Sequence, residues 1–543
     1  MKRKSFYTGV ILIFVCIFAF HYFLNYREAI KPPSEVWAKE VLISKGDINQ
    51  HPALTGYNDN YIIAHQDGDN IKVVLVDKLG KILKEINFKP DGKEPKELGV
   101  FTDNENIYIT YMLTDKYYNT VKILKLNDTL ELIKEEQIDK MRTKLNVSEN
   151  ILCIFYDDYI EFIDFAKNSS SKISLDDKVD IPSTIPYKDK YLIGYITDEK
   201  QYKYFFMDKS GQITEPKFAF DARDRPDSIF TSNTISYKGN DIFAVIEYLY
   251  KSKEFFVQTF KFSLDKDDIC RSDFRLMENY TNDKNELMNF NVDVNNLSNY
   301  PNQEGLIIGS CGRKTFKMKE QPDIVEISIE DNKNSLNGLF ENKYGAVIKN
   351  AVSNSRNNSV YPVSYKNVIV FCEPTGGNRS NVYITSKDEE FKSVNNKSRP
   401  SEAISSLIST SESTLFGIAY VVIYGSLWII PSLSLISLIS IIEFKFNKTI
   451  RKALFIFAYS LAYLLKLYFI NKLFYVDQAM IMPSFFSLNV GIACTLLISL
   501  VCLSYGYKNY SENLDYNVIV LSFSKPILID SLLTLILFVS FII

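Results

Sequence analysis

Two side chains of opposite charge fall inside otherwise apolar segments near the C-terminus. Lys466 lies 14 residues beyond Lys452, and Asp530 lies 13 residues beyond Asn517. If both segments cross a membrane as helices in the same direction, a rise of about 1.5 Å per residue places both groups ~20 Å from the same boundary. An unpaired charge in hydrocarbon is costly, so we predict an intramembrane pair of Lys466 and Asp530. The pair is either structural or part of an ion or substrate path, and a lysine that extends to the interface is the remaining alternative.

Histidine is too scarce for most histidine-based chemistry. The chain has three histidines. His21 falls in the first apolar segment, and the two others, His51 and His65, cannot supply a three-histidine zinc site. His65 ends a run typical of a β-strand, and two interpretations are open for it. It either faces the central channel of a ring of strands or packs as an ordinary side chain.

Other motifs that carry chemistry are weak or missing. Two carboxylate clusters, at residues 67–70 and 265–268, resemble calcium ligands, but neither has the glycine and terminal glutamate spacing of an EF-hand loop. The cysteines between residues 29 and 414 show no C-x-x-C spacing and are expected to be buried thiols, with a disulfide at Cys270 as the alternative. No P-loop, G-x-S-x-G or G-x-G-x-x-G motif is present. The sequence therefore predicts no catalytic residue, cofactor or metal.

Charge is distributed unevenly along the chain. The 62 basic and 65 acidic residues give a net charge of −3, which excludes a polybasic nucleic-acid-binding protein. Residues 415–543 contain only eight basic and five acidic side chains, whereas residues 29–414 contain 50 and 59. This contrast indicates an apolar, membrane-embedded C-terminal part and an acidic, water-exposed middle part.

Five apolar segments are long enough to span a bilayer, and they cover residues 6–24, 415–442, 453–475, 484–506 and 518–541. Bulky residues at the end of the first segment argue against cleavage by a signal peptidase, so we expect an uncleaved anchor. Basic residues flank the first segment at positions 2–4 and follow the second at positions 445–452, which predicts that both flanks are cytoplasmic. The chain is then a multi-pass protein of the cell membrane with residues 29–414 outside.

The external segment contains seven short runs of aromatic or β-branched residues, spaced roughly 40 to 65 residues apart as in propeller blades. The runs begin at Tyr61, Ile107, Ile151, Tyr191, Ile242, Leu306 and Val368. Two copies, residues 60–88 and 190–218, match strand for strand and share a D-x-x-G hairpin at Asp77 and at Asp208. An aspartate caps such a turn with its side chain, and the glycine supplies the positive φ.

These hairpins resemble those of bacterial β-propeller repeat proteins of the PQQ-like and YVTN-like kind. The resemblance implies an all-β domain of about seven four-stranded blades, without a Trp-Asp signature and with one blade lengthened by residues 270–302. Residues 36–43 are expected to supply the outermost strand of the last blade and close the ring. An array of β-sandwiches is the rival architecture, but its units are about twice as long.

The predicted organisation has four parts: a basic tip and transmembrane anchor (1–28), a propeller (29–395), a flexible serine-rich linker (396–414) and four transmembrane helices (415–543). The favoured function is non-enzymatic. The propeller binds a ligand or protein partner, and the helices anchor it, relay a signal or assemble with other membrane subunits. The alternatives are a transporter or channel component that uses Lys466 and Asp530, and a surface enzyme with carboxylate chemistry.

Overall fold

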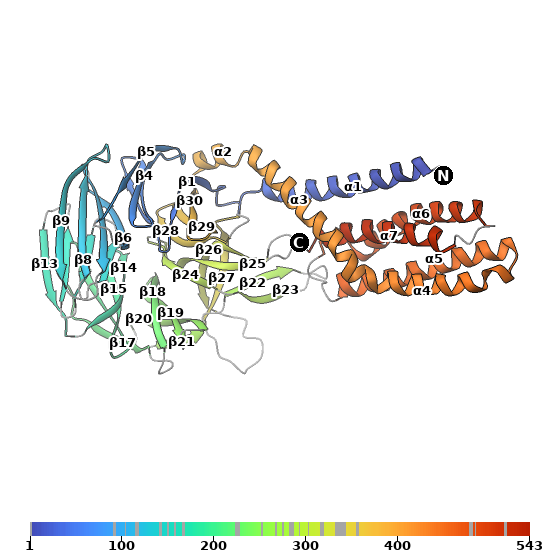
Figure 1. Cartoon of the computed structure of the whole chain (residues 1–543). Coiled ribbons are helices and arrows are strands. Elements are labelled where there is room, and N and C mark those ends of the chain that lie inside the picture. Colours follow the sequence, from blue (N-terminus) through green and yellow to red (C-terminus); the bar gives the residue numbers. More distant parts are fainter. Residues whose placement is uncertain are drawn as a thin grey trace.

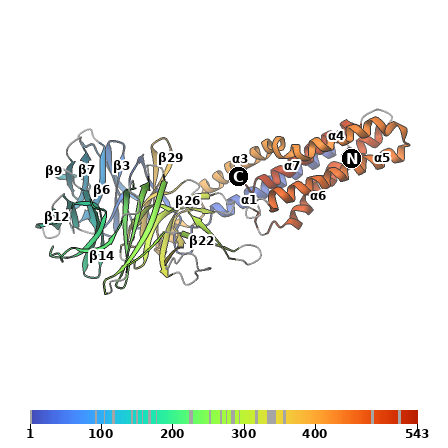
Figure 2. The same cartoon turned by 90° about the horizontal axis from the view of Figure 1, so that it is seen from below.

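A ring of β-sheets and a bundle of long helices lie end to end in the computed structural model of the chain (Figures 1 and 2). The structure describes all residues except 1–2, 91–93, 104, 115–118, 141–143, 149–150, 157–158, 165–168, 177, 223–227, 251–253, 266–268, 274–275, 282–286, 293, 302, 315–319, 332–343, 355–357, 477–481, 484, 515–518 and 543.

Seven sheets form the blades of a β-propeller, as the sequence predicted. In chain order the first five blades are β2–β5 (Ala53–Tyr57, Asn60–Asp67, Asn70–Val76, Ile82–Phe88), β6–β9 (Pro95–Thr102, Ile107–Thr114, Asn119–Leu126, Leu132–Lys140), β10–β13 (Lys144–Ser148, Ile151–Phe155, Tyr159–Asp164, Ser169–Ser174), β14–β17 (Val179–Tyr187, Lys190–Thr197, Gln201–Asp208, Lys217–Asp221) and β18–β21 (Ser228–Lys238, Asp241–Tyr250, Glu254–Ser263, Ile269–Asp273). The first strand of each blade contacts the first strand of the next, so these strands form the inner ring.

Blade 6 is wider than the others. Its core strands are β24–β27 (Val294–Asn299, Leu306–Lys314, Glu320–Asp331, Tyr344–Ala351), and the hairpin of β22 (Leu276–Thr281) and β23 (Leu287–Val292) adds to its outer edge through parallel pairing of β22 with β27. The predicted insertion at residues 270–302 contributes this hairpin, which extends towards the helices in Figures 1 and 2.

The seventh blade closes the ring with a strand from the start of the chain. It contains β28 (Val360–Tyr365), β29 (Val368–Gly376) and β30 (Arg379–Ser386), and β1 (Val41–Asp47) pairs with β30 as the outermost strand. The role predicted for residues 36–43 is therefore filled by a strand that begins five residues later. Pairing with β1 covers the edge of β30 that would otherwise be open. It also joins the beginning and the end of the propeller chain within one sheet.

The seven runs found in the sequence are the second strands of the seven blades. These strands are buried on both faces between neighbouring blades, and β7 has seven consecutive buried residues. Burial on both faces explains why these runs are continuously apolar and do not alternate between apolar and polar residues. They could therefore be recognised by composition alone.

The two matched hairpins have the same geometry. The Oδ1 atom of Asp77 accepts hydrogen bonds from the backbone N–H groups of Leu79 and Lys81, at 2.9 and 2.8 Å. Asp208 does the same for residues 210 and 212, and φ is +88° at Gly80 and +86° at Gly211. The side-chain cap and the positive φ predicted from the D-x-x-G pattern are both confirmed.

Within the described residues, five helical segments are long and apolar enough to cross a membrane: Phe6–Ala29, Pro400–Lys445, Lys448–Val476, Leu488–Glu512 and Ile519–Val539. Their helices are α1 (Arg3–Ala29), α3 (Pro400–Tyr420), α4 (Ser426–Ile442), α5 (Lys448–Ile470), α6 (Leu488–Glu512) and α7 (Ile519–Val539). The π-helical turn η1 (Val421–Gly425) joins α3 to α4, η2 (Glu443–Lys445) follows α4, and η3 (Asn471–Val476) extends α5. A short helix, α2 (Glu389–Asn395), precedes α3.

The prediction of a flexible linker at residues 396–414 is wrong over most of this range, because the helix α3 begins at Pro400. Proline starts the helix, and Glu402 accepts a hydrogen bond from the Arg399 N–H. The serine and threonine hydroxyls donate to carbonyls one turn earlier, as Thr410 does to Ser406 at 2.7 Å, so their polarity does not interrupt the helix. The small side chains then face α1 and α7.

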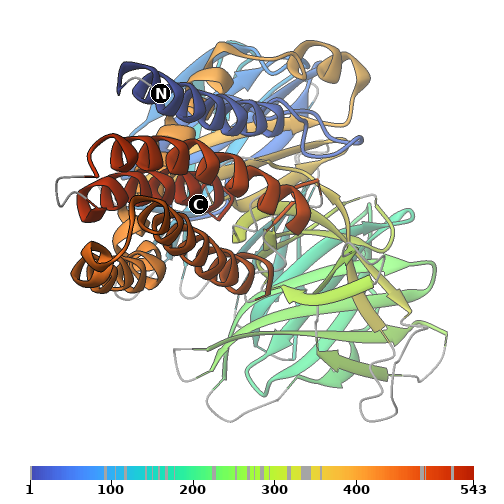
Figure 3. The same cartoon turned by 90° about the vertical axis from the view of Figure 1, so that its right-hand side faces the viewer.

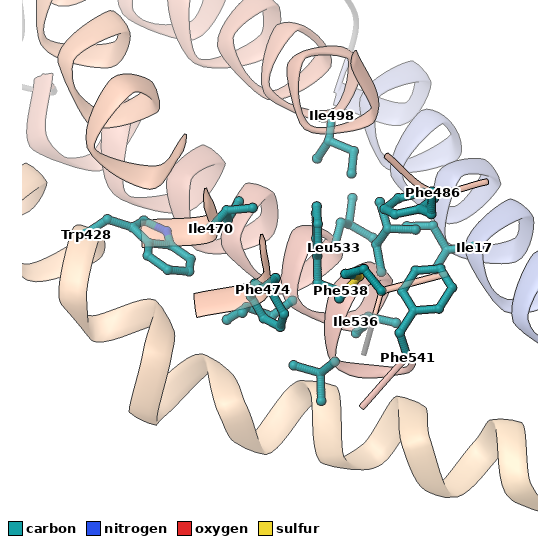
Figure 4. Packing of buried hydrophobic residues seen from close by; sticks show 14 of the residues in the cluster. Ile17, Trp428, Ile470, Phe474, Phe486, Ile498, Leu533, Ile536, Phe538 and Phe541 are labelled. Atoms are coloured by element: carbon teal, nitrogen blue, oxygen red, sulfur yellow. The ribbon is translucent and has the colours of Figure 1, made fainter. Parts of the chain in front are cut away.

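The N-terminal helix is part of the bundle rather than a separate anchor. It packs against α3, α6 and α7, and Figure 3 shows it alongside the C-terminal helices. Ile17 of α1 joins a buried cluster with Trp428, Phe486 and Phe538 (Figure 4). Polar contacts fix its position, because the Asn25 side chain donates to the Thr410 hydroxyl at 2.8 Å.

Candidate functional site

The structure brings Lys466 and Asp530 into direct contact inside the bundle. The Nζ atom of Lys466 on α5 lies 2.9 Å from both carboxylate oxygens of Asp530 on α7. The two residues are 1% and 3% exposed. A buried charge of either sign would be strongly unfavourable alone, so each residue stabilises the presence of the other.

Two hydroxyl groups complete this ion pair. Ser499 on α6 accepts a hydrogen bond from Lys466 Nζ at 2.6 Å and donates to Asp530 at 2.9 Å, and Thr534 lies 3.4 Å from the ammonium group. The four side chains, which we call the charge cluster, join α5, α6 and α7. The sequence did not identify Ser499 or Thr534, because a hydroxyl in an apolar helix is usually satisfied by its own backbone.

The other predicted site residue, His65, does not face the central channel. It is fully buried on β3, with Nε2 2.8 Å from the Ser44 hydroxyl of β1 and Nδ1 2.7 Å from the backbone oxygen of Gln66. The carbonyl can only accept, so Nδ1 donates to it. His65 therefore holds the first blade against the closing strand of the seventh, and the channel-facing interpretation is wrong.

We expect the propeller to lose stability as the pH falls from about 6.5 to about 4. Burial lowers the pKa of His65 to about 4, whereas an unfolded histidine has a pKa of about 6.5. Between these values the unfolded chain binds a proton that the folded chain excludes, which costs roughly 3 kcal/mol at the low end. The wild type should lose more thermal stability between pH 7 and 4 than the His65→Gln variant. Identical pH profiles for the two proteins would contradict this role.

Polar contacts also link the inner strands. The side-chain amide of Asn299 on β24 donates to the Ser183 hydroxyl on β14 at 3.0 Å, and its oxygen accepts the Ile235 N–H of β18 at 2.8 Å. The Ser364 hydroxyl of β28 donates to the Asn299 carbonyl at 3.1 Å. Asn299 thus joins four blades through satisfied hydrogen bonds, a structural role rather than a binding one.

The junction between ring and bundle is held by charged groups. Lys39, just before β1, is 4% exposed and lies 2.8 Å from Glu402 of α3. Arg399 donates to the Glu40 carbonyl at 2.8 Å. Phe391 of α2 is buried against the first and last blades, where it packs near Gly80. The helices therefore leave the propeller as a fixed extension of its closing blade.

One of the two carboxylate clusters that resemble calcium ligands, at residues 67–70, lines a hollow. A hollow of about 770 Å³ opens at the seam between blades 1 and 7 and includes Asp67, Asp69 and Arg379. Among the described residues, no group of three or more histidine, cysteine or acidic side chains could hold a metal ion. The cluster at residues 265–268 lies largely outside the described residues. Cys153, Cys311 and Cys372 are buried.

No family model matches the chain, and no curated protein matches it. Among solved structures, the Pan2 WD40 domain of Neurospora crassa is 9% identical with a TM-score of 0.36, covering 65% of this chain and 90% of its own. The N-terminal domain of Nup159 is 8% identical (TM-score 0.37; 66% and 98%), and the coronin WD40 domain of Toxoplasma gondii is 10% identical (TM-score 0.36; 68% and 88%). The seven-bladed propeller is established by the strand pairing of the chain itself and does not rest on these similarities.

Proposed function

We propose that this chain is a multi-pass membrane protein whose extracytoplasmic propeller recognises a peptide or protein partner and is rigidly coupled to its transmembrane bundle. The main observation behind the proposal is the way in which the propeller joins the helical bundle. Both chain ends of the propeller enter the same bundle, through α1 and α3, and the Lys39–Glu402 ion pair links the two paths. A passive anchor requires only one flexible tether, whereas this arrangement transmits a displacement of the last blade to the helices.

The length of the helical segment that contains α3 and α4 supports this coupling. The apolar segment Pro400–Lys445 has 46 residues, or about 70 Å of helix, more than twice a hydrocarbon core of about 30 Å. The first turns of α3 therefore stand between the propeller and the bilayer. They remain in contact with α1 there, as the Asn25–Thr410 hydrogen bond illustrates.

The distribution of basic residues supports an external propeller. The N-terminus lies at the end of the bundle away from the propeller, and the C-terminus lies near the propeller (Figure 1). The helices alternate in direction, so η2 and the end of α6 share the N-terminal side. That side carries Lys4, Lys445, Lys448, Arg451, Lys452 and Lys508. The side of a membrane protein with an excess of basic residues is usually cytoplasmic. The propeller, at the other end of the bundle, would then lie outside the cytoplasm.

Recognition rather than catalysis suits the propeller. Within the described part of the chain, His65 and Asn299 are committed to contacts between blades. The hollow presents charged and polar side chains at loops, where propellers commonly bind partners.

The partner should be captured from the loop end of the propeller. A photo-crosslinking amino acid at Asn378, in the turn between β29 and β30 beside the hollow, should give adducts of increased mass in intact cells. The same amino acid at Leu132, which is 48% exposed on the outer strand of blade 2, is the matched control. Absence of adducts at Asn378, or equal adducts at both positions, would contradict the proposal.

A transport function is the second candidate, and the charge cluster is the observation that favours it. A lysine, a carboxylate and two hydroxyls joined by hydrogen bonds in the bundle interior are groups that can move a proton or bind an ion. A variant with Lys466 and Asp530 both replaced by leucine should abolish ion flux in liposomes if the cluster is a path. Unchanged flux would reject it.

A further inference from the structure

The hollow lies at the blade ends opposite the helices. The strand β1 begins at Val41, next to the junction, and ends at Asp47 in the hollow, while β30 runs in the opposite direction from Arg379. The turn between β3 and β4 supplies a third wall. Three separate segments of blades 1 and 7 therefore converge on one space of about 770 Å³, the size of a small-molecule site.

Charges of both signs line this space without neutralising each other. Lys45, Lys89 and Arg379 provide cations, and Asp47, Asp67 and Asp69 provide carboxylates. Among the described residues, none of the three cations lies within 4.0 Å of a carboxylate. Opposite charges in one hollow that remain unpaired are available to a ligand that carries both signs.

The walls are held in place by backbone contacts. The Asp47 N–H donates to the Asp67 carboxylate at 3.0 Å, and the Gly68 N–H donates to the Asp47 carbonyl at 2.9 Å. A Cβ atom on Gly46 would lie 2.9 Å from the Gln66 backbone oxygen, so only glycine lets β1 approach β3 this closely. The backbone that bears the charged groups is therefore held in place, which reduces the conformational entropy lost when a ligand binds.

An uncommitted hydroxyl group adds specificity for a polar ligand. Ser380 is 4% exposed and lines the hollow, and in the part of the chain that the structure describes its side chain makes no hydrogen bond. Asn70, at the start of β4, and Asn381, on β30, also line the hollow. A hydroxyl group and two carboxamides that line one hollow can donate to and accept from a peptide bond.

We infer that this hollow binds a short peptide with free ends, whose carboxylate contacts Arg379 or the lysines and whose ammonium group contacts the aspartates. The inference rests on the proposed recognition function and names its ligand class. Arginine binds carboxylates through two parallel hydrogen bonds, and carboxylates accept strongly from an ammonium group. A divalent cation is disfavoured, because the described acidic side chains form no group that could hold a metal.

The test measures binding of L-alanyl-L-alanine to the full chain in lipid nanodiscs by calorimetry. Two derivatives keep the same skeleton but carry one charge: the N-acetyl dipeptide and the dipeptide amide. We expect the unmodified dipeptide to bind, and each derivative to bind at least about tenfold more weakly, because one end loses its charged partner. No binding of the dipeptide, or equal binding of all three compounds, would overturn the inference.

Variants locate the site. Arg379→Gln and Asp69→Asn should each weaken dipeptide binding about tenfold, whereas Lys349→Gln, an exposed cation on β27 of blade 6, should leave it unchanged. Unaltered binding in Arg379→Gln would place the dipeptide elsewhere and overturn the assignment. Crosslinking of a protein partner at Asn378 without any dipeptide binding would leave the proposed function standing while rejecting this ligand class.

Discussion

Replacing Lys466 by leucine is expected to lower the free energy of unfolding of the helical bundle by about 3–5 kcal/mol, because Asp530 would remain buried without a counter-charge. Asp530→Leu should have a similar effect for the converse reason. Lys472→Leu is the matched control: this lysine follows on the same helical segment, but it is exposed. Thermal unfolding of each purified variant in the same detergent measures the difference.

The double variant Lys466→Leu with Asp530→Leu should recover most of the loss. Two leucines fill the site with apolar groups of similar size, and breaking a buried pair costs far more than removing it altogether. Ser499 and Thr534 would retain their hydroxyls, which can donate to their own helix backbone. If the double variant instead loses the sum of the two single losses in free energy of unfolding, the contact between the two charges contributes nothing to stability.

Deletion of residues 60–88, which removes β3 to β5, is expected to abolish cooperative folding of the whole propeller. The ring is closed by contacts between successive inner strands and by the pairing of β1 with β30. An opened ring exposes two blade edges and the buried faces of both neighbours. A variant that still unfolds in one sharp transition would contradict a closed ring and favour independent sheets.

A matched deletion tests whether the loss comes from the ring rather than from shortening the chain. Removing the β22–β23 hairpin takes away an outer addition to blade 6 that contributes nothing to the inner ring. The remaining seven blades should unfold cooperatively. Circular dichroism and protease resistance of the two deletion variants give the comparison.

The propeller was predictable because its strongest signals are local. The second strand of each blade is buried on both faces and therefore appears in the sequence as an apolar run. The D-x-x-G turn places its capping aspartate and its glycine close together in the sequence. A third hairpin of this kind was missed. Asn127 accepts hydrogen bonds from the N–H groups of residues 129 and 131, but the positive φ of +56° is adopted by Leu130, which gives no sequence signal.

The features that could not be predicted depend on contacts between distant segments. The serine-rich stretch was taken for a linker, because its composition does not reveal the helix surfaces of α1 and α7 against which it packs. The sequence left open whether His65 faces the channel or packs, because only the position of Ser44 on the closing strand shows which side of β3 it faces. Nothing in the sequence marks Arg379 as part of a site, and only the joining of blades 1 and 7 brings it into one hollow with Asp69.

The Lys466–Asp530 contact was accessible to sequence analysis for a simple reason. Helix rise converts residue number into depth, and two opposite charges at one depth in hydrocarbon have few other partners. The residues around them could not be derived in this way, since depth does not specify which face of a helix points inward.

Sidedness of the propeller is tested most directly by labelling cysteines in intact cells. Asn378→Cys places a thiol at the loop end of the last blade, and Lys445→Cys places one at the other end of the bundle, each compared with the unsubstituted protein. A membrane-impermeant maleimide should label Asn378→Cys in intact cells and Lys445→Cys only after lysis. Labelling of Lys445→Cys in intact cells, with Asn378→Cys protected until lysis, would place the propeller inside the cell and contradict the external recognition role that we propose.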